Sequence, residues 1–233
     1  MTSIAIEGTY NARQVGPDST PWLVRAASLD GVTDAGSAAL TGLGLALVVD
    51  LREDEERGFA RHRVPIRHIP IYRSREGSPV TGTLEESYET MILTRGQELT
   101  AAVAAIADSP GPVLVHCTTG KDRTGLVVAL ALLAGGLPEE DIVDDYALSA
   151  TDVGVARRSW AETALRALGL GDEEYAAALR LHLGSPSSAI RHALHILTRF
   201  GGAEAYLLRH GLTVDHFHAL RDRFGVERVE PAD

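Results

Sequence analysis

Residues 113–133 read VLVHCTTGKDRTGLVVALALL, and this stretch contains the most informative pattern of the chain. An apolar run leads to Cys117, five residues follow, and a helical pattern begins around Arg123, which predicts a buried strand, a short loop and a helix. In this arrangement the backbone N–H groups of residues 118–122 gather around one point, and the positive end of the helix dipole faces that point. Gly120 permits the tight turn that the loop requires. The stretch therefore predicts an anion-binding loop.

Two side chains give this loop a chemistry. Arg123 carries a planar guanidinium that can bind two phosphate oxygens at once. The field of the loop favours the thiolate of Cys117, and a thiolate held behind a bound phosphate is an activated nucleophile. A lone cysteine is more often buried and inert, but the strand–loop–helix setting and Arg123 favour a nucleophile here. We expect the phosphate to be bound by Thr118, Thr119, Gly120, Lys121 and Arg123.

A nucleotide-binding loop of the Walker type also joins a strand, a Gly-Lys pair and a helix. Its G-x-x-x-x-G-K-[ST] spacing is absent, because Val115 lies five residues before Gly120 and Asp122 follows the lysine. The sequence therefore disfavours nucleotide binding by this loop.

Composition excludes several classes of partner. The 233 residues carry a formal net charge of −10, and nucleic acids and anionic membranes are poor partners for such an acidic chain. No apolar stretch approaches the roughly 18 residues of a membrane span. The N-terminal residues also lack the basic start and apolar run of a secretory signal. We therefore expect a cytoplasmic protein without integral membrane association.

Cys117 is the only cysteine of the chain, and Lys121 is the only lysine. A single cysteine excludes an internal disulfide and a structural zinc site built from several thiolates. Since the other 21 of the 22 basic residues are arginines, the lone lysine is expected where a compact ammonium is needed. We expect Lys121 to add positive charge over the mouth of the pocket, with an ordinary exposed lysine as the alternative.

The N-terminal two thirds alternate short apolar runs with helical patterns. This alternation predicts an α/β fold with a central, largely parallel sheet flanked by helices. One helix is expected from Thr33 to Leu43, and one long helix from Thr83 or Leu84 to about Asp108. The expected strands are 22–27, 45–51, 64–71 and 113–117, of which the second and fourth are nearly continuous apolar runs.

Strand patterns stop after the loop, and the rest of the sequence is helical. We interpret residues 1–233 as a single domain, with the α/β part at about 1–150 and a helical cap at about 151–233. The helices are expected at 125–133, 138–149, 161–168, 172–183, 187–200, 203–210 and 214–224.

HCTTGKDRTG, residues 116–125, resembles the H-C-x5-R-[ST]-G signature of the cysteine-dependent phosphatase superfamily. More narrowly, it is similar to an atypical bacterial group of protein-tyrosine, dual-specificity and phosphoinositide phosphatases, whose loop reads HCxxGKDRTG. Four weaker motifs occur in the right order along the chain: NARQVG resembles the N-[FY]-R-D-x-G opening, VVDLREDEE resembles VxDLRxxxE, and IVDDYALS and GGAEAYLLRHGLT resemble two later elements. Ala12 and Gln14 depart from the opening motif, where an aromatic residue and an aspartate are usual.

The resemblance implies a hydrolase that forms a phosphocysteine on Cys117. Arg123 would stabilise the charge on the transferred phosphate, with no metal or other cofactor. His116 is implied to bond to nearby backbone and to support the thiolate. Thr124 is expected either to donate a hydrogen bond to the sulfur as it leaves or to be a simple first-turn residue.

Asp50 and Arg52 end the second expected strand, at the edge where open α/β sheets bind ligands. They match the DLR of the related group, which implies that they orient the loop or a water, and a salt bridge without a catalytic part is the alternative. The acidic run Glu53 to Glu56 that follows is expected to be a solvated helix start.

Breaking a phosphate ester requires a proton for the leaving oxygen. In the wider superfamily an aspartic acid on a mobile loop usually supplies it, but residues 60–99 contain no aspartate, and Asp108 is expected at the surface. Asp122, inside the loop, is therefore the better candidate, as its position in the related group also implies. The alternative is that Asp122 pairs with a basic residue and orders the loop.

The sequence thus predicts a phosphomonoester hydrolase acting on phosphotyrosine proteins, with dual or phosphoinositide specificity as an open extension. One alternative is a non-catalytic module that binds phosphorylated partners, against which the intact Cys117, Asp122 and Arg123 argue. Another is a sulfur-transfer or arsenate-reducing enzyme, which the absence of a second cysteine disfavours. Helices after Ala150 cover the pocket in the related group, so the cap is expected to act as a lid.

Overall fold

The computed structural model describes residues 1–15, 21–59, 61–73 and 79–224. Its six-stranded sheet has the order β1-β2-β3-β6-β4-β5. The strands from β3 to β5 in this order run parallel, whereas β1 and β2 pair antiparallel at one edge. The predicted α/β fold with a largely parallel sheet is confirmed. The strands are β1 (Thr2–Ser3), β2 (Arg13–Val15), β3 (Leu23–Ala26), β4 (Leu47–Asp50), β5 (Ile66–His68) and β6 (Val113–His116).

β6 lies in the middle of the sheet, between β3 and β4. Val115 pairs with Arg25 on one side and with Val49 on the other. All four residues of β6 are buried, as its continuous apolar run predicted. Because the carboxyl ends of parallel strands meet at one edge, the residues that follow β3, β4 and β6 come together there.

The antiparallel edge had no counterpart in the sequence prediction. β2 consists of Arg13, Gln14 and Val15, which are all buried. Two of these three side chains are polar, so the strand lacks both the apolar run and the alternation by which strands are recognised. Its burial arises from long-range contacts, which a local pattern does not contain.

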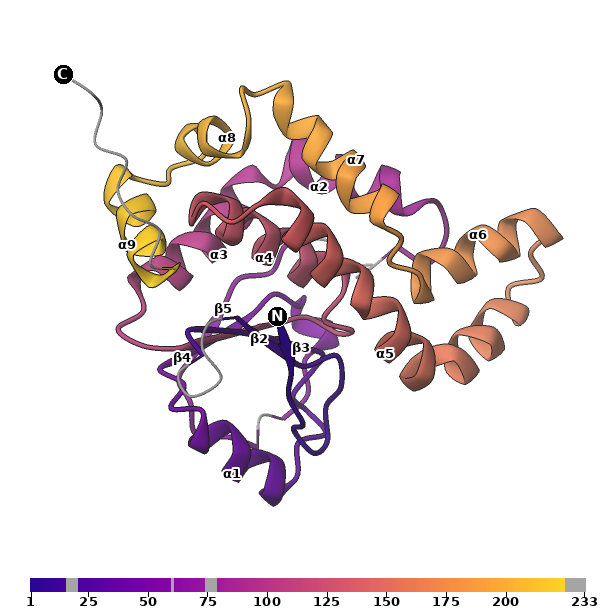
Figure 1. Ribbon diagram of the computed structural model, residues 1–233. Coiled ribbons are helices and arrows are strands. Elements are labelled where there is room, and N and C mark those ends of the chain that lie inside the picture. The colour runs from indigo at the N-terminus through magenta and orange to yellow at the C-terminus, as the bar shows by residue number, and fades with distance from the viewer. Residues whose placement is uncertain (16–20, 60, 74–78, 225–233) are drawn as a thin grey trace.

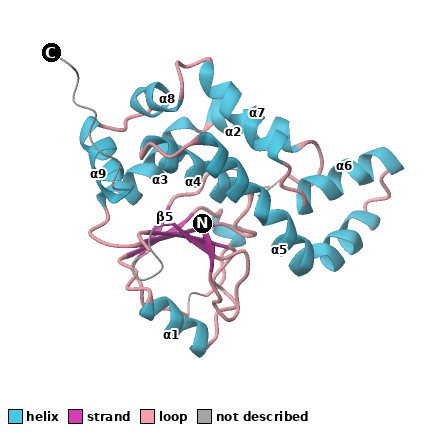
Figure 2. Ribbon diagram, viewed as in Figure 1, coloured by secondary structure: helices cyan, strands magenta, loops and turns pink. Residues whose placement is uncertain are grey.

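Helices cover both faces of the sheet (Figure 1, Figure 2). α1 (Asp34–Gly42) packs on one face, where Leu40 and Leu114 share a hydrophobic cluster. The larger set of helices covers the opposite face, where Val115 and Val127 belong to the main cluster. Neighbouring residues of β6 thus point into opposite cores, because side chains alternate along a strand.

The helices of the larger layer follow the predicted order. Within the described ranges, none has the length and apolar composition needed to cross a membrane. They are α2 (Leu84–Thr94), α3 (Gly96–Asp108), α4 (Asp122–Ala134), α5 (Glu139–Arg166), α6 (Asp172–Leu183), α7 (Ser187–Thr198), α8 (Ala203–Arg209) and α9 (Val214–Phe224).

Two predicted helix boundaries were wrong. The single helix expected up to Asp108 is divided, because Arg95 leaves the helical conformation between α2 and α3. A Cβ on Gly96 would lie 2.3 Å from the ring of His210, so the chain needs a glycine where α8 ends against this junction. The opposite error concerns α5, which is continuous where two helices were expected. Its middle contains Gly154 but no proline, and one glycine weakens a helix without ending it.

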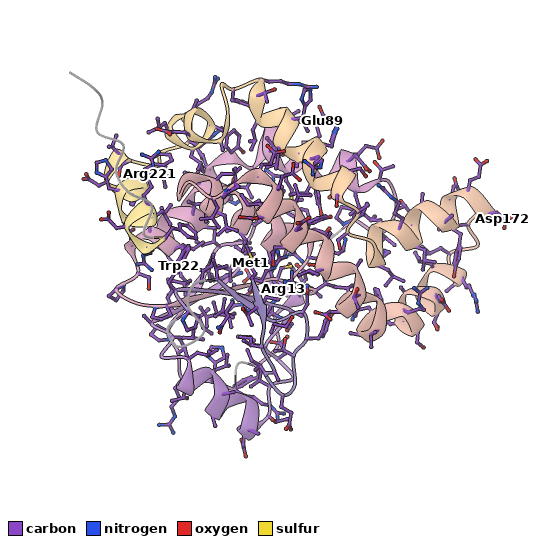
Figure 3. The ribbon with its side chains drawn as sticks, viewed as in Figure 1. Met1, Arg13, Trp22, Glu89, Asp172 and Arg221 are labelled. Atoms are coloured by element: carbon purple, nitrogen blue, oxygen red, sulfur yellow. The ribbon has the colours of Figure 1, made fainter. Side chains whose placement is uncertain are left out.

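The C-terminal helices fall into two groups. Ile190, Tyr206 and Phe217 of α7, α8 and α9 belong to the main hydrophobic cluster, and the Tyr206 hydroxyl donates to the Ile92 carbonyl at 2.8 Å. The second half of α5 and α6 instead form a hairpin that projects from the rest, with Asp172 near its tip (Figure 1, Figure 3). The region expected to form one helical cap, residues 151–233, therefore has two parts in the described chain. The α5–α6 hairpin projects, whereas α7, α8 and α9 pack into the main hydrophobic core.

Candidate active site

The loop between β6 and α4 has the predicted strand–loop–helix geometry. β6 ends at His116 and α4 begins at Asp122. Gly120 has a φ of 67°, and a Cβ there would lie 2.3 Å from the Ala26 carbonyl oxygen. The loop thus packs directly against the end of β3, in a conformation that favours glycine.

Cys117 is buried, yet it lines a cavity of about 260 Å³ at this edge of the sheet. Thr118, Thr119, Asp122 and Arg123 line the same cavity. Burial acts to lower the pKa of Arg123, but hydrogen bonds to a glutamate and the charge of the neighbouring Cys117 sulfur raise it above its ordinary value. The sulfur of Cys117 and the guanidinium of Arg123 therefore border the same cavity, an arrangement that nucleophilic attack on a bound phosphate requires.

The guanidinium of Arg123 is fixed by Glu56. Its two terminal nitrogens donate to the two carboxylate oxygens at 2.5 and 2.7 Å. The hydroxyl of Thr118 donates to the same carboxylate at 2.6 Å, and the ring of Tyr72 lies 4.8 Å from the guanidinium carbon. Burial acts to raise the pKa of Glu56, but the bonds and charge of Arg123 lower it to about 2. The pair holds Arg123 in one orientation at the cavity.

A short 3-10 helix, η1 (Asp54–Glu56), carries this glutamate. Its carboxylate accepts a bond from the N–H of Glu53 at 2.9 Å, and the Glu53 carboxylate accepts one from the N–H of Tyr72 at 2.8 Å. The prediction of a solvated acidic run was therefore wrong for Glu53 and Glu56. Both turn inward, because a guanidinium and backbone N–H groups offer them partners there.

Four successive carbonyl oxygens of the loop are bonded by donors outside the cavity. The carbonyl of Cys117 lies 3.2 Å from Nδ1 of His116, and the carbonyl of Thr118 accepts from the N–H of Ser28 at 3.1 Å. In a trans peptide the N–H points away from the C=O of the same unit. Since the carbonyls are bonded on the side away from the cavity, the N–H groups that follow them are turned toward the cavity. The two remaining bonds are Asn11 Nδ2 to the Thr119 carbonyl at 3.0 Å and Arg25 Nη2 to the Gly120 carbonyl at 2.7 Å.

Asn11 and Arg25 belong to a buried ionic network beside the loop. Asp145 of α5 accepts from Arg13 at 2.7 Å and from Arg25 at 2.5 Å. Arg13 also donates to Oδ1 of Asn11 at 2.5 Å, which leaves the amide nitrogen of Asn11 to donate to the loop. In Figure 3, Arg13 lies in the interior near the sheet. Burial acts to raise the pKa of Asp145, but the two arginines hold it below its ordinary value.

His116 bonds to backbone, as predicted, through Nδ1 and the Cys117 carbonyl. Burial lowers its pKa to about 4, although Asp50, 3.8 Å from Nε2, acts in the opposite direction. Asp50 and Arg52 form an ion pair at 2.9 Å, and Arg52 also pairs with Asp30 at 2.5 Å. These bonds form the salt bridge that the sequence left open as the alternative, and through His116 the pair adjoins the loop. The orienting role of Asp50 and Arg52 stays a prediction.

Asp122 lines the cavity, and its Oδ1 accepts two bonds. The hydroxyl of Tyr88 donates at 2.8 Å and the ammonium of Lys121 at 2.6 Å. Burial and the charge of Asp122 raise the pKa of Tyr88 and of Tyr146, which lies 2.5 Å from the Tyr88 oxygen, so both hydroxyls stay protonated. The sequence left two roles open for Asp122, a general acid and a partner that orders the loop. Its place on the cavity wall fits the first role, and its bond to Lys121 fits the second.

Lys121 does not lie over the mouth of the pocket, nor is it exposed. Its side chain is fully buried, and the ammonium donates to Asp122 and to the Leu181 carbonyl of α6 at 3.0 Å. The ammonium lies behind the cavity wall, because its two acceptors, on Asp122 and Leu181, belong to residues that form this wall. Phosphate binding by Lys121 stays a prediction. From this position its ammonium would act on a bound phosphate through its charge, without direct contact. The hydroxyl of Thr124 is buried without a hydrogen-bond partner among the described residues, so its bond to the sulfur also stays a prediction.

The α5–α6 hairpin forms one wall of the cavity. α5 contributes Arg157 and Trp160, and α6 contributes Leu181 and His182. The rings of Trp160 and His182 lie 5.8 Å apart. The expected lid function of this hairpin stays a prediction, which limited proteolysis combined with turnover measurements can test.

Sequence reasoning missed several of these residues. Glu56 is the last residue of VVDLREDEE and matches the final E of VxDLRxxxE, so the motif contained a signal for it. Tyr88 and Arg25 lie inside ordinary helix and strand patterns and carry no local signal. Arg157 and Trp160 lie where the sequence predicted no helix, between 138–149 and 161–168.

Comparison with known proteins gives consistent matches over nearly the whole chain. A family model described as the tyrosine phosphatase family matches residues 4–225. A tyrosine-protein phosphatase of Nostoc commune is 30% identical over 220 residues, which cover 87% of this chain and 74% of the relative. The triple specificity protein phosphatase PtpB of Mycobacterium tuberculosis is 29% identical over 184 residues, 60% of this chain and 67% of the relative. The similarity therefore does not rest on the loop motif alone.

Proposed function

Because this chain belongs to the tyrosine phosphatase family and is a tyrosine-phosphatase-like hydrolase, we propose that it hydrolyses phosphotyrosine in proteins through a phosphocysteine on Cys117. One observation carries the proposal. Cys117 and the Glu56-bound Arg123 line one cavity at the start of α4, where the loop N–H groups and the helix dipole favour an anion.

The reaction has two steps. First the sulfur of Cys117 attacks phosphorus, an S–P bond forms, the P–O bond to tyrosine breaks, and the leaving oxygen takes a proton from Asp122. A water oxygen then attacks phosphorus and gives a proton to Asp122, the S–P bond breaks, and inorganic phosphate leaves the restored thiolate. Arg123 and the loop N–H groups stabilise the charge on the transferred group in both steps.

The acid role of Asp122 is supported by its place on the cavity wall. Both bonds to its carboxylate go to Oδ1, so Oδ2 is the atom that we propose carries the proton. The Lys121 contact fits the alternative, in which the ionised carboxylate orders the loop. The two roles differ in how the rate depends on the leaving group, because only an acid assists a poor one.

The proposed substrate follows from the relatives and from the cavity walls. Two relatives are named tyrosine-protein phosphatase and triple specificity protein phosphatase, which supports phosphotyrosine proteins as substrates and a specificity broader than phosphotyrosine. Phosphoinositide specificity is proposed from the loop sequence alone. Tyr72 and Trp160 give the cavity aromatic walls that suit an aryl phosphate. We place the protein in the cytoplasm, since a free catalytic cysteine is best preserved in a reducing compartment.

The test compares wild type with Cys117→Ser on a phosphotyrosine peptide, a phosphoserine peptide and a phosphoinositide. We expect the variant to bind inorganic phosphate but to lose turnover by a factor on the order of 10³ or more. Acid quenching with labelled substrate should trap phosphate on wild type and not on the variant. Comparable turnover by the variant, with an unchanged melting temperature, would refute the cysteine mechanism.

A further inference from the structure

The basic side chains that line the cavity differ in their partners. Arg123 is held in a two-bond ion pair. His182 lies 3.0 Å from the Val80 carbonyl, and burial lowers its pKa, so it is uncharged at neutral pH. Arg157 contacts the ring of Trp160 at 3.9 Å and has no hydrogen-bond or ion-pair partner within the described part of the chain. Arg157 is therefore the cation that remains available to a ligand at this wall.

Two other arginines of the α5–α6 hairpin have acidic partners. Arg180 donates two bonds to Glu85 at 2.7 and 2.9 Å, and Arg158 lies 3.6 Å from Glu162. Arg157 differs from these two arginines, because it is half-buried at the cavity wall and has no acidic partner within the described ranges. Partial burial of an unpaired guanidinium costs free energy, which an anionic group of a ligand would offset.

Arg157 and Arg123 reach the cavity from different elements. Arg123 belongs to the first turn of α4, beside the loop, whereas Arg157 and Trp160 come from the projecting half of α5 (Figure 1). A substrate whose phosphate lies on the loop extends away from it, along the cavity toward this wall. Trp160 is 50% exposed, so it can contact a ligand while it holds the guanidinium of Arg157 by a cation–π interaction.

Building on the proposed function, we propose that Arg157 binds an acidic side chain beside the phosphotyrosine of the substrate. The substrate class is then a phosphotyrosine peptide with aspartate or glutamate next to the phosphorylated residue. A guanidinium binds a carboxylate with two parallel hydrogen bonds, which gives direction as well as charge. An anionic membrane is disfavoured as the source of the second anion, because the net charge of −10 opposes such a surface.

The experiment uses two phosphotyrosine peptides that differ only in whether the flanking residues are aspartate or asparagine. The measured quantity is the ratio of kcat/KM for the acidic peptide to that for the neutral one. We expect a ratio of about tenfold in wild type, since one charge-assisted contact at a partly exposed site is of that size. Arg157→Gln should bring the ratio close to one, and Arg157→Lys should retain part of it. Added salt should lower the wild-type ratio.

Arg158→Gln is the matched control, because this neighbour pairs with Glu162 and does not line the cavity. It should keep the wild-type ratio and the wild-type rate on a small aryl phosphate. Equal efficiency of wild type on both peptides, or a ratio that survives in Arg157→Gln, would overturn the assignment of Arg157 alone. Higher wild-type turnover of phosphoinositide vesicles than of either peptide would overturn it as well. Absence of wild-type turnover on every substrate, the aryl phosphate included, would instead refute the proposed function.

Discussion

At the scale of single residues, the proposed acid role of Asp122 can be tested by the dependence of the rate on the leaving group. We expect Asp122→Asn to reduce kcat on a phosphate ester with a poor leaving group by about 10²-fold. On a nitrophenyl phosphate, whose leaving group needs little assistance, the loss should be only severalfold. Steady-state rates on a series of esters with graded leaving groups measure this difference.

Tyr88→Phe provides the control for Asp122→Asn. It removes the hydroxyl that donates to Oδ1 but keeps the carboxylate, so any loss should be similar for good and poor leaving groups. Equal losses across the ester series in Asp122→Asn would remove the acid role and favour the alternative, in which the carboxylate pairs with Lys121 and orders the loop.

The residues that the sequence predicts are those whose signal is local. Cys117 and Arg123 are recognisable because a strand, a five-residue loop and a helix lie consecutively in the chain. Glu56 is 67 residues from Arg123 and ends an acidic run of the kind that usually faces solvent. The VVDLREDEE motif marks the residue, but its pairing with Arg123 becomes visible only in the fold. Lys121 was placed on the wrong side of the wall because its acceptor, the Leu181 carbonyl, lies on a distant helix.

At the scale of elements, the loop between β6 and α4 depends on donors from the β2–β3 side. Asn11→Asp tests this dependence with little change of shape. The carboxylate keeps an acceptor for Arg13 but puts a second acceptor where the Thr119 carbonyl needs a donor. Asparagine and aspartate both tolerate the left-handed backbone of residue 11, which has a φ of 55°. We expect the inhibition constant for inorganic phosphate or vanadate to rise about tenfold, because one buried hydrogen bond of the loop is lost.

Thr9→Val is the matched control for Asn11→Asp. Thr9 also donates from its side chain to a backbone carbonyl, that of Ala27, at 3.2 Å, but this carbonyl lies outside the loop. The control should leave the affinity for tetrahedral anions unchanged. If Asn11→Asp did the same, the loop would hold its conformation without Asn11, and the positioning role would be lost.

The elements themselves were predicted where the pattern is periodic or continuously apolar. β4 and β6 are apolar runs buried on both faces, and α6 has the predicted bounds, Asp172–Leu183. Errors occurred where tertiary packing decides. The break lies at Arg95, directly before Gly96, which packs against His210 of a distant segment. α5 continues through residues 150–160, which contain no proline.

At the scale of the whole molecule, one buried and two half-buried histidines couple stability to pH. Burial lowers the pKa of His62, His116 and His182, and that of His116 reaches about 4. In the unfolded chain these rings protonate near the ordinary pKa of 6.5, whereas in the folded chain they protonate only at a lower pH. As the pH falls below 6.5, the unfolded state therefore binds more protons than the folded state and is favoured.

We expect the free energy of unfolding to be constant between about pH 7 and 9 and to fall as the pH drops from 6.5 toward 5. His116 alone should contribute about 2 kcal/mol between pH 6.5 and 5. Urea unfolding at four pH values between 6.5 and 5 measures the slope. This window lies above the range, from the ordinary pKa of 4.5 down to about 2, in which Glu56 adds acid sensitivity. His116→Asn, which keeps a donor for the Cys117 carbonyl, should flatten the slope, whereas replacing the exposed His218 by Gln should not. An unchanged slope in His116→Asn would mean that this ring is already charged in the folded protein.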